Sequence, residues 1–140
     1  MKSLRLTNGE AVFEVDPSFE EDALLPSHGD ARLVLRVRSH GYAAESFAWI
    51  GRDELAAFLR DVKTLDERSS GGVTLESLSP NELRLSLVAI DGLGHFAAEG
   101  TFGRRIHDVN AEFWHSISFG FELDRGQIQE VLAWASSNAA

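Results

Sequence analysis

The stretch IDGLGHFAAEG, residues 90–100, holds the residue types that most readily suggest chemistry. Two glycines followed by a histidine (Gly92, Gly94 and His95) are compatible with a phosphate-binding loop or a catalytic turn. A dinucleotide-binding loop must open a helix, because the helix N-terminus supplies the N–H groups that bind the phosphate. Here the residues after the histidine alternate, which is typical of a strand. The stretch therefore predicts a reverse turn between two strands.

The histidines and carboxylates lack the spacing of a metal or catalytic site. His95 and Glu99 share a strand face, but four residues of strand span about 13 Å, too far to bind one ion. His115 has the parity of its apolar neighbours, which predicts a buried core histidine. Glu112 and Glu122 are expected on the solvent side of one strand, too far apart to act on one substrate. No G-x-S-x-G, P-loop or EF-hand pattern occurs, so we expect no enzyme activity, no catalytic or metal-binding residue and no cofactor.

Two segments have the apolar spacing of amphipathic helices. In GRDELAAFLRDVKTL the helix is expected to start at Asp53 or its neighbour and to end before the breaker sequence ERSSGG. The closing segment LDRGQIQEVLAWASSN repeats the spacing, and Asp124 followed by Gln127 has the form of a capping box. The two predicted buried stripes are Leu55, Phe58, Leu59 and Val62, and Ile128, Val131, Leu132 and Ala135.

Most of the remaining chain alternates apolar and polar residues, which indicates strands with one buried face. Strands are predicted near residues 4–6, 11–15, 31–39, 42–50, 73–78, 81–90, 95–102 and 112–123. SFAWIGRDELAAFLRDV and SFGFELDRGQIQEVLAWA both run strand, turn, helix, so the two halves look alike. We expect an α+β fold, a single domain over residues 1–140, in which two α-helices pack on one face of a twisted, mainly antiparallel β-sheet.

The solvent face of that sheet is the first candidate binding surface. Alternation places Arg36, Arg84 and Trp114 on it, with Glu45, Glu76, Ser86 and Ser116. An exposed tryptophan among mixed charges is typical of an anchor in a protein contact. A solvated face with one exposed aromatic residue is the alternative, and a bulge that shifted the parity would bury the tryptophan.

The charge distribution indicates a second candidate surface. The chain has 13 Lys and Arg against 22 Asp and Glu, a net charge of −9 that disfavours binding to nucleic acid. Residues 16–30, DPSFEEDALLPSHGD, lack periodicity and are expected to form a long acidic loop. Its Glu20, Glu21 and Asp22 would attract a basic protein partner, with plain solubility as the alternative interpretation.

The same composition bears on location. The chain has no cysteine, no apolar run long enough to span a bilayer and no apolar segment of a signal peptide near its first residues. We therefore expect a cytoplasmic protein that does not bind a membrane.

Two segments carry a resemblance to a known family. DGLGH, followed by a strand of small residues, and SFGFELDRGQIQEVL near the end resemble small bacterial proteins identified as WapI-type immunity proteins. The resemblance extends from about Arg32 to Trp134. It implies an antitoxin, a cytosolic protein that binds and blocks a contact-delivered toxin, often a nuclease. It implies no functional residues for this chain.

Taken together, these observations predict a non-enzymatic protein-binding module, immunity-like, that neutralises a basic toxin. The predicted partner-binding residues are those of the acidic loop and the sheet face: Glu20, Glu21, Asp22, Trp114, Arg36 and Arg84. Two alternatives stay open. One is a domain that binds a small ligand between sheet and helices. The other is a homodimer with a structural role, in which the exposed sheet face pairs with itself.

Overall fold

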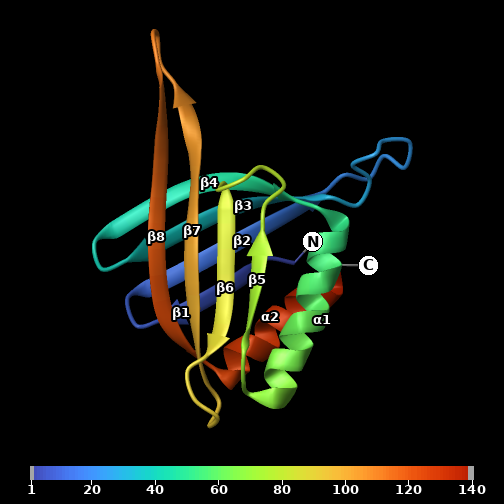
Figure 1. Cartoon of the computed structure of the whole chain (residues 1–140), viewed down its shortest axis with the longest axis vertical. Coiled ribbons are helices and arrows are strands. Elements are labelled where there is room, and N and C mark those ends of the chain that lie inside the picture. The colour runs from blue at the N-terminus through green and yellow to red at the C-terminus, as the bar shows by residue number, and fades with distance from the viewer. Residues whose placement is uncertain (1, 139–140) are drawn as a thin grey trace.

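The computed structural model describes residues 2–138, which form two successive units of four strands and one helix (Figure 1). The first unit contains β1 (Leu4–Asn8), β2 (Ala11–Phe19), β3 (Ala31–Ser39), β4 (Tyr42–Ile50) and α1 (Arg52–Arg68). The second contains β5 (Gly72–Glu76), β6 (Leu83–Ala89), β7 (His95–His107), β8 (Glu112–Asp124) and α2 (Arg125–Asn138). The halves that look alike in sequence therefore share one order of elements.

The predicted α+β class and the antiparallel strands are confirmed. The strands are divided between two four-stranded sheets, however, where one sheet was expected. The first sheet has the order β1-β2-β3-β4 and the second the order β5-β6-β7-β8. Alternation reports which residues share a face of one strand, but not which strands pair, so it could not separate the two sheets.

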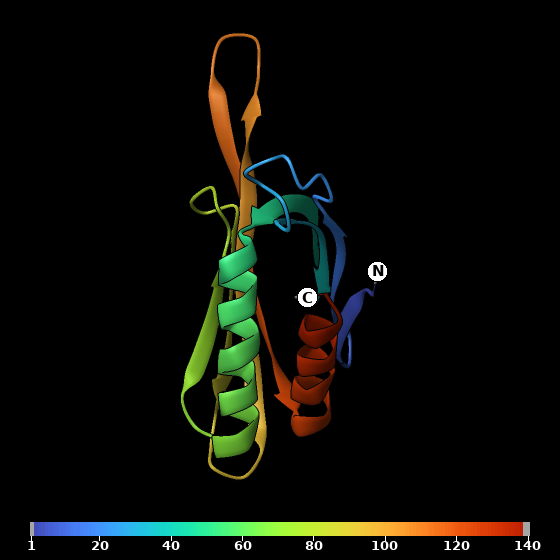
Figure 2. The same ribbon diagram turned by 90° about the vertical axis from the view of Figure 1, so that its right-hand side faces the viewer.

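The core lies between the two sheets and the helices. The Phe13 ring of β2 is 4.9 Å from that of Phe119 on β8, so the apolar faces of the two sheets meet. The helices lie side by side and close the open side between the sheets, rather than covering one face of one sheet (Figure 2). The buried helical residues are Leu55, Phe58, Val62 and Leu65 of α1, and Ile128, Val131, Trp134 and Ala135 of α2. Among residues 2–138, no helix is long and apolar enough to cross a bilayer.

The two helices begin in different ways. At α2 the prediction of Asp124 as the cap is confirmed, because the Gln127 N–H donates to its Oδ1 at 2.9 Å. The Gln127 side chain does not complete a capping box but accepts a hydrogen bond from the Thr7 N–H of β1. At α1 the cap comes from elsewhere in the chain: the Arg52 N–H donates to Asp30 Oδ1 at 2.9 Å. This helix also runs through Arg68, beyond the predicted end.

The acidic loop is shorter than predicted. Strand β2 continues through residues 16–19, so the loop comprises residues 20–30. Pro17 pairs with Leu33 of β3. It is compatible with the strand because β1 no longer runs beside β2 at this point: the last residue of β2 that pairs with β1 is Val15. An N–H is not needed there, and proline is found in such edge positions.

Strands β7 and β8 extend beyond the rest of their sheet. The last residue of β7 that pairs with β6 is Phe102, opposite Leu83. Beyond it, residues 103–116 form a two-stranded hairpin that projects from the body and that we call the arm (Figure 1). The prediction that His115 is buried is wrong, and Phe113 of the same parity is also exposed. Both side chains have the expected parity, but no second layer lies opposite this part of the strand.

Candidate functional site

The stretch 90–95 that first suggested chemistry is a turn, as predicted. The Ile90 N–H donates to the His95 carbonyl at 2.9 Å, and Gly94 has a φ of +90°. Asp91 holds the turn: its Oδ1 accepts from the Leu93 N–H at 2.8 Å and its Oδ2 lies 2.7 Å from His95 Nδ1. This contact lowers the pKa of Asp91 and raises the pKa of His95, since each charge stabilises the other.

A carboxylate and an imidazole in contact are two members of a catalytic triad, but a nucleophile is needed as well. Within residues 2–138 no hydroxyl group is hydrogen-bonded to His95. In the same part of the chain, no three histidine or acidic side chains are grouped as metal ligands would be. The Asp91–His95 pair is thus accounted for by its role in the turn.

The structure does not bring the predicted sheet-face residues together. Arg36 lies on the outer face of the first sheet, where it contacts Asp16 at 2.5 Å and Glu45 at 3.3 Å. Arg84 lies on the outer face of the second sheet and contacts Glu76 at 3.7 Å. Trp114 is 44% exposed, as its parity predicts, but it belongs to the arm. One solvent face was expected, whereas two sheets have two separate outer faces.

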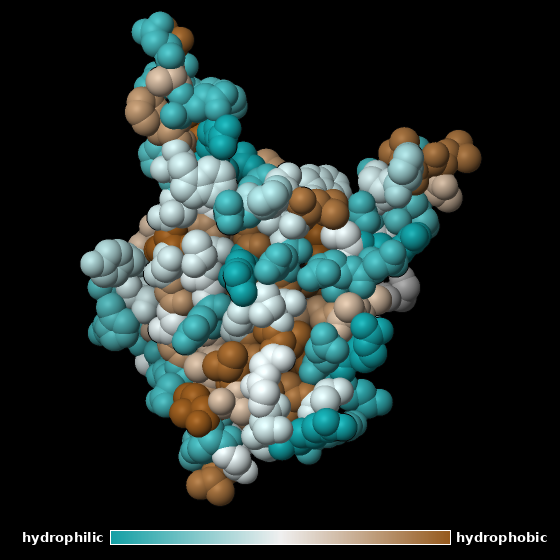
Figure 3. Space-filling view, in the orientation of Figure 1, coloured by the Kyte–Doolittle hydropathy of each residue, from teal (hydrophilic) through white to brown (hydrophobic). Residues whose placement is uncertain are grey.

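The acidic loop is a second projection, with an internal structure of its own. The Glu20 N–H donates to the Asp30 carbonyl at 3.0 Å, and the Gly29 N–H donates to the Glu20 carbonyl at 2.9 Å. Its tip carries Leu24 and Leu25, which are 93% and 44% exposed, next to the acidic residues predicted to attract a partner. Figure 3 shows this lobe with hydrophobic and hydrophilic atoms side by side. Glu21 and Asp22 are exposed, and Glu20 is half-buried at the base of the loop.

The arm carries the largest group of exposed apolar side chains in the described chain. Ile106 and Phe113 pair across its two strands, 43% and 54% exposed, on the face continuous with the apolar side of the second sheet. Trp114 lies on the opposite face, and Val109 at the tip is 89% exposed. A two-stranded ribbon gains little from burying its own side chains, so such residues indicate a surface for a partner.

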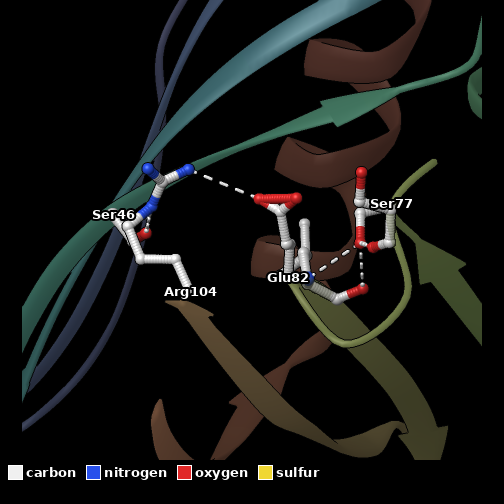
Figure 4. Close-up of polar contacts among 6 residues, drawn as sticks. Ser46, Ser77, Glu82 and Arg104 are labelled. Atoms are coloured by element: carbon white, nitrogen blue, oxygen red, sulfur yellow. Dashed lines mark hydrogen bonds and ion pairs between the residues drawn. The ribbon is translucent and has the colours of Figure 1, made fainter. Parts of the chain in front are cut away.

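The base of the arm is fixed to both sheets through Arg104 (Figure 4). Its guanidinium donates to Ser46 Oγ of β4 at 3.2 Å and to Glu82 Oε2, before β6, at 3.4 Å. The same group lies 3.7 Å from the centre of the Phe47 ring. Charge-assisted hydrogen bonds and cation–π contact are strong when partly buried, and here they hold the arm over β4.

A glycine allows the chain to make this junction. The Gly103 N–H donates to the Glu82 carbonyl at 3.2 Å. A Cβ at this position would lie 2.2 Å from the carbonyl oxygen of His115, so no other residue fits without moving the neighbouring strand. Beside it, Ser77 Oγ accepts from the Leu83 N–H at 2.9 Å and orders the β5–β6 connection (Figure 4).

Between the arm and the first half of β4 lies an open groove of about 450 Å³. Its walls are mostly apolar, and they include the basic Arg104, the acidic Glu45 and several other polar groups. Its lining includes Tyr42, Ala44 and Ser46 of β4, Arg104 and Ile106 of β7, and His115 of β8. A groove of this composition suits an apolar segment with a few hydrogen-bonding groups.

Sequence reasoning missed Arg104, Ile106 and Phe113 as surface residues. The predicted strands end at residue 102 and resume at residue 112, whereas β7 continues to His107 and only residues 108–111 form the turn. One weak signal was available: Ile106 has the same parity as Phe102, with the polar residues Arg105 and His107 on either side of it. It did not show that the neighbouring strand β6 starts only at Leu83.

No protein-family model, curated protein or solved structure matches the chain. The resemblance to WapI-type immunity proteins therefore stays a prediction.

Proposed function

We propose that the chain is a non-enzymatic protein-binding module that contacts its partner through the arm. The observation that carries this proposal is the exposure of Ile106, Phe113 and Trp114 on a hairpin that projects from the body. Aromatic side chains at a protruding position are typical centres of protein interfaces, because they bury a large area at a small entropic cost.

The chemistry of the partner follows from the second projection. The loop 20–30 presents Glu21 and Asp22 next to two exposed leucines, on a protein with a net charge of −9. Acidic groups around an apolar anchor favour a basic protein, since complementary charge speeds association and fixes orientation. Within this class, we propose the role of an immunity protein that binds and neutralises a basic toxin.

In the experiment, the chain captures binding proteins from a lysate of the native cells, and the affinity of each purified captured protein is then measured. Three baits are compared with the wild-type chain: the arm variant Ile106→Ser with Phe113→Ser, the loop variant Glu20→Lys, Glu21→Lys and Asp22→Lys, and Leu93→Ser. Leu93 is 83% exposed in the turn at the other end of β7, so its variant is a matched control for the loss of an exposed apolar group.

We expect a basic protein to bind the wild type and the control, and to lose most of its affinity for the arm variant. The loop variant should weaken association mainly at low salt, where charge steering is strongest. A captured protein that binds the arm variant as tightly as the wild type would contradict the proposed function. The immunity role is tested by expressing the captured protein alone and together with the chain: the captured protein should stop growth when expressed alone, and co-expression of the chain should restore it.

The groove beside Arg104 favours a second candidate, the binding of a small ligand. Its volume of about 450 Å³ lies within the range of ligand sites, but it is open along one side. A small ligand would protect the groove residues from hydrogen exchange without any requirement for Trp114 or Val109, which lie outside the groove lining.

A further inference from the structure

We infer that the free edge of β4, beneath the arm, accepts an extended segment of the protein partner as an added strand. This inference rests on the proposed function and states how the partner is held. The main observation is that a row of free backbone N–H and C=O groups and an uncovered apolar face lie side by side.

The row of backbone groups follows from the strand register. Trp49 of β4 pairs with Arg32 of β3. The Trp49 carbonyl accepts from the Leu78 N–H, so the backbone groups of Trp49 face away from β3. In an antiparallel ladder this orientation alternates, so the N–H and C=O groups of Ala43, Glu45 and Phe47 also face outward. Within residues 2–138, no hydrogen bond uses these six groups. An added strand is the structure that satisfies such a row.

The two ends of this edge are limited. At one end the Leu78 N–H occupies the Trp49 carbonyl, whereas Arg104 contacts only the side chains of Ser46 and Phe47 and leaves the Phe47 backbone groups unbonded. At the other end the strand begins at Tyr42, which is 72% exposed. The open edge therefore comprises residues 42–47, about 20 Å of strand, which is a common strand length.

The arm supplies the second layer for the added strand. Its inner face carries Ile106, Phe113 and His115, and it stands over the edge of β4, as the lining of the groove shows. Strands β1–β4 are covered by the second sheet in the same way. A segment paired with β4 would thus place alternate side chains beneath Ile106 and Phe113, which are now half exposed.

The occupant with the best fit is a short segment of another protein, with apolar residues at every second position. A second copy of this chain would have to offer a free strand edge. Its β1 edge is bonded to Gln127 of α2 and its β5 edge contacts α1, which leaves β4 and the edge strand β8. Pairing through either strand would bring the arm of the second copy against the arm of the first. The open edge of β4 is also shorter than β8.

The test begins with a displayed library of short random peptides, selected on the full chain. Selected peptides should alternate apolar and polar residues, and their binding should slow hydrogen exchange at the amides of Ala43, Glu45 and Phe47. Glu45→Pro removes the central outward N–H and should lower their affinity about ten-fold or more. Glu45→Ala, which loses only the contact with Arg36, should bind normally.

Ser118→Pro is the matched control on the other free edge. Ser118 of β8 pairs with Thr101 of β7. The Gly103 N–H donates to Glu82, so the backbone groups of Gly103 face β6 and those of its partner Ser116 face away from β7. This orientation repeats at every second residue, so the backbone groups of Ser118 face outward as well. This variant should bind the peptides normally. The inference is overturned if no peptide is selected, if Glu45→Pro binds as the wild type does, or if Ser118→Pro loses binding. Protection of the β4 amides in the protein alone, rising with concentration, would assign the edge to a second copy and also overturn it.

The identified partner separates this inference from the proposed function. If the partner loses affinity for the arm variant but binds Glu45→Pro unchanged, the protein-binding function stands and strand addition fails. If it binds the arm variant unchanged, the proposed function itself fails.

Discussion

The two units of the chain share an order of elements but extend different connections. In the first unit β2 and β3 are joined by the long loop 20–30, whereas β6 and β7 are joined by a short turn held by Asp91. In the second unit the extension lies one hairpin later: β7 and β8 form 13 pairs, and β3 and β4 form 9. Both extensions leave the body at the same end (Figure 1).

This difference separates what the fold needs from what it presents. The shared parts, four strands and a helix in each unit, supply the residues of the common core. The unshared parts carry most of the large exposed apolar side chains, among them Leu24, Ile106, Phe113 and Trp114. We therefore expect changes in the extensions to alter binding and changes in the shared parts to alter stability.

The largest effect should come from the same substitution made in the two parts. Phe58→Ala removes a side chain that is 2% exposed on α1, and should lower the free energy of unfolding by about 3–5 kcal/mol. Phe113→Ala, in the arm, should change it by less than about 0.5 kcal/mol. Denaturant unfolding of both variants measures this. Equal losses would show that the arm is part of the core.

A smaller effect should distinguish the two helix caps. Asp124→Ala and Asp30→Ala should each lower the free energy of unfolding by about 1 kcal/mol, since each leaves one N–H at a helix start without its acceptor. Only Asp30→Ala should also speed hydrogen exchange at Gly29, because Asp30 ties the loop to α1. If the loop amides exchange as in the wild type, the loop is ordered independently of the helix.

The smallest effect concerns the short turn of the second unit. The pKa of His95 is raised and that of Asp91 is lowered, so the contact stabilises the fold while both groups are charged. The histidine contribution is complete below about pH 6.5 and is lost as the pH rises through its folded pKa. The aspartate contribution is present above about pH 3.9 and is lost as the pH falls through its lowered pKa.

An NMR titration of the His95 ring tests this. Asp91→Asn keeps an oxygen that accepts from the Leu93 N–H but removes the negative charge, so the titration midpoint of His95 should fall toward 6.5. An unchanged midpoint would mean that another group raises the pKa.

Much of the fold was predictable from the sequence, and the failures have a common cause. Both helices, the turn at Asp91 and the exposure of Trp114 follow from periodicity and local hydrogen bonding, which a short segment determines by itself. The two sheets, the cap of α1 by Asp30 and the exposure of Phe113 depend on residues distant in the chain. Periodicity assigns Phe113 the right face, but only the end of β6 at Leu83 leaves that face uncovered.

The candidate site was predicted less well than the fold. Of the six residues expected to bind a partner, Glu21, Asp22 and Trp114 are exposed on the two projections, and Glu20 is half-buried. Arg36 and Arg84 form ion pairs on the separate outer faces of the two sheets. The groove and the edge of β4 could not be inferred, because they require the relative position of the two sheets.

The register of the arm has a consequence for how related sequences could diversify. Each strand of the hairpin repeats its two faces every second residue, and the Asp108 and Val109 N–H groups at the tip donate to acceptors within the tip itself. Insertions or deletions that keep this two-residue period on both strands would lengthen or shorten the reach of the hairpin while Ile106 and Trp114 kept their sides. The position of the binding surface would then change in steps of two residues per strand, without any change in the core.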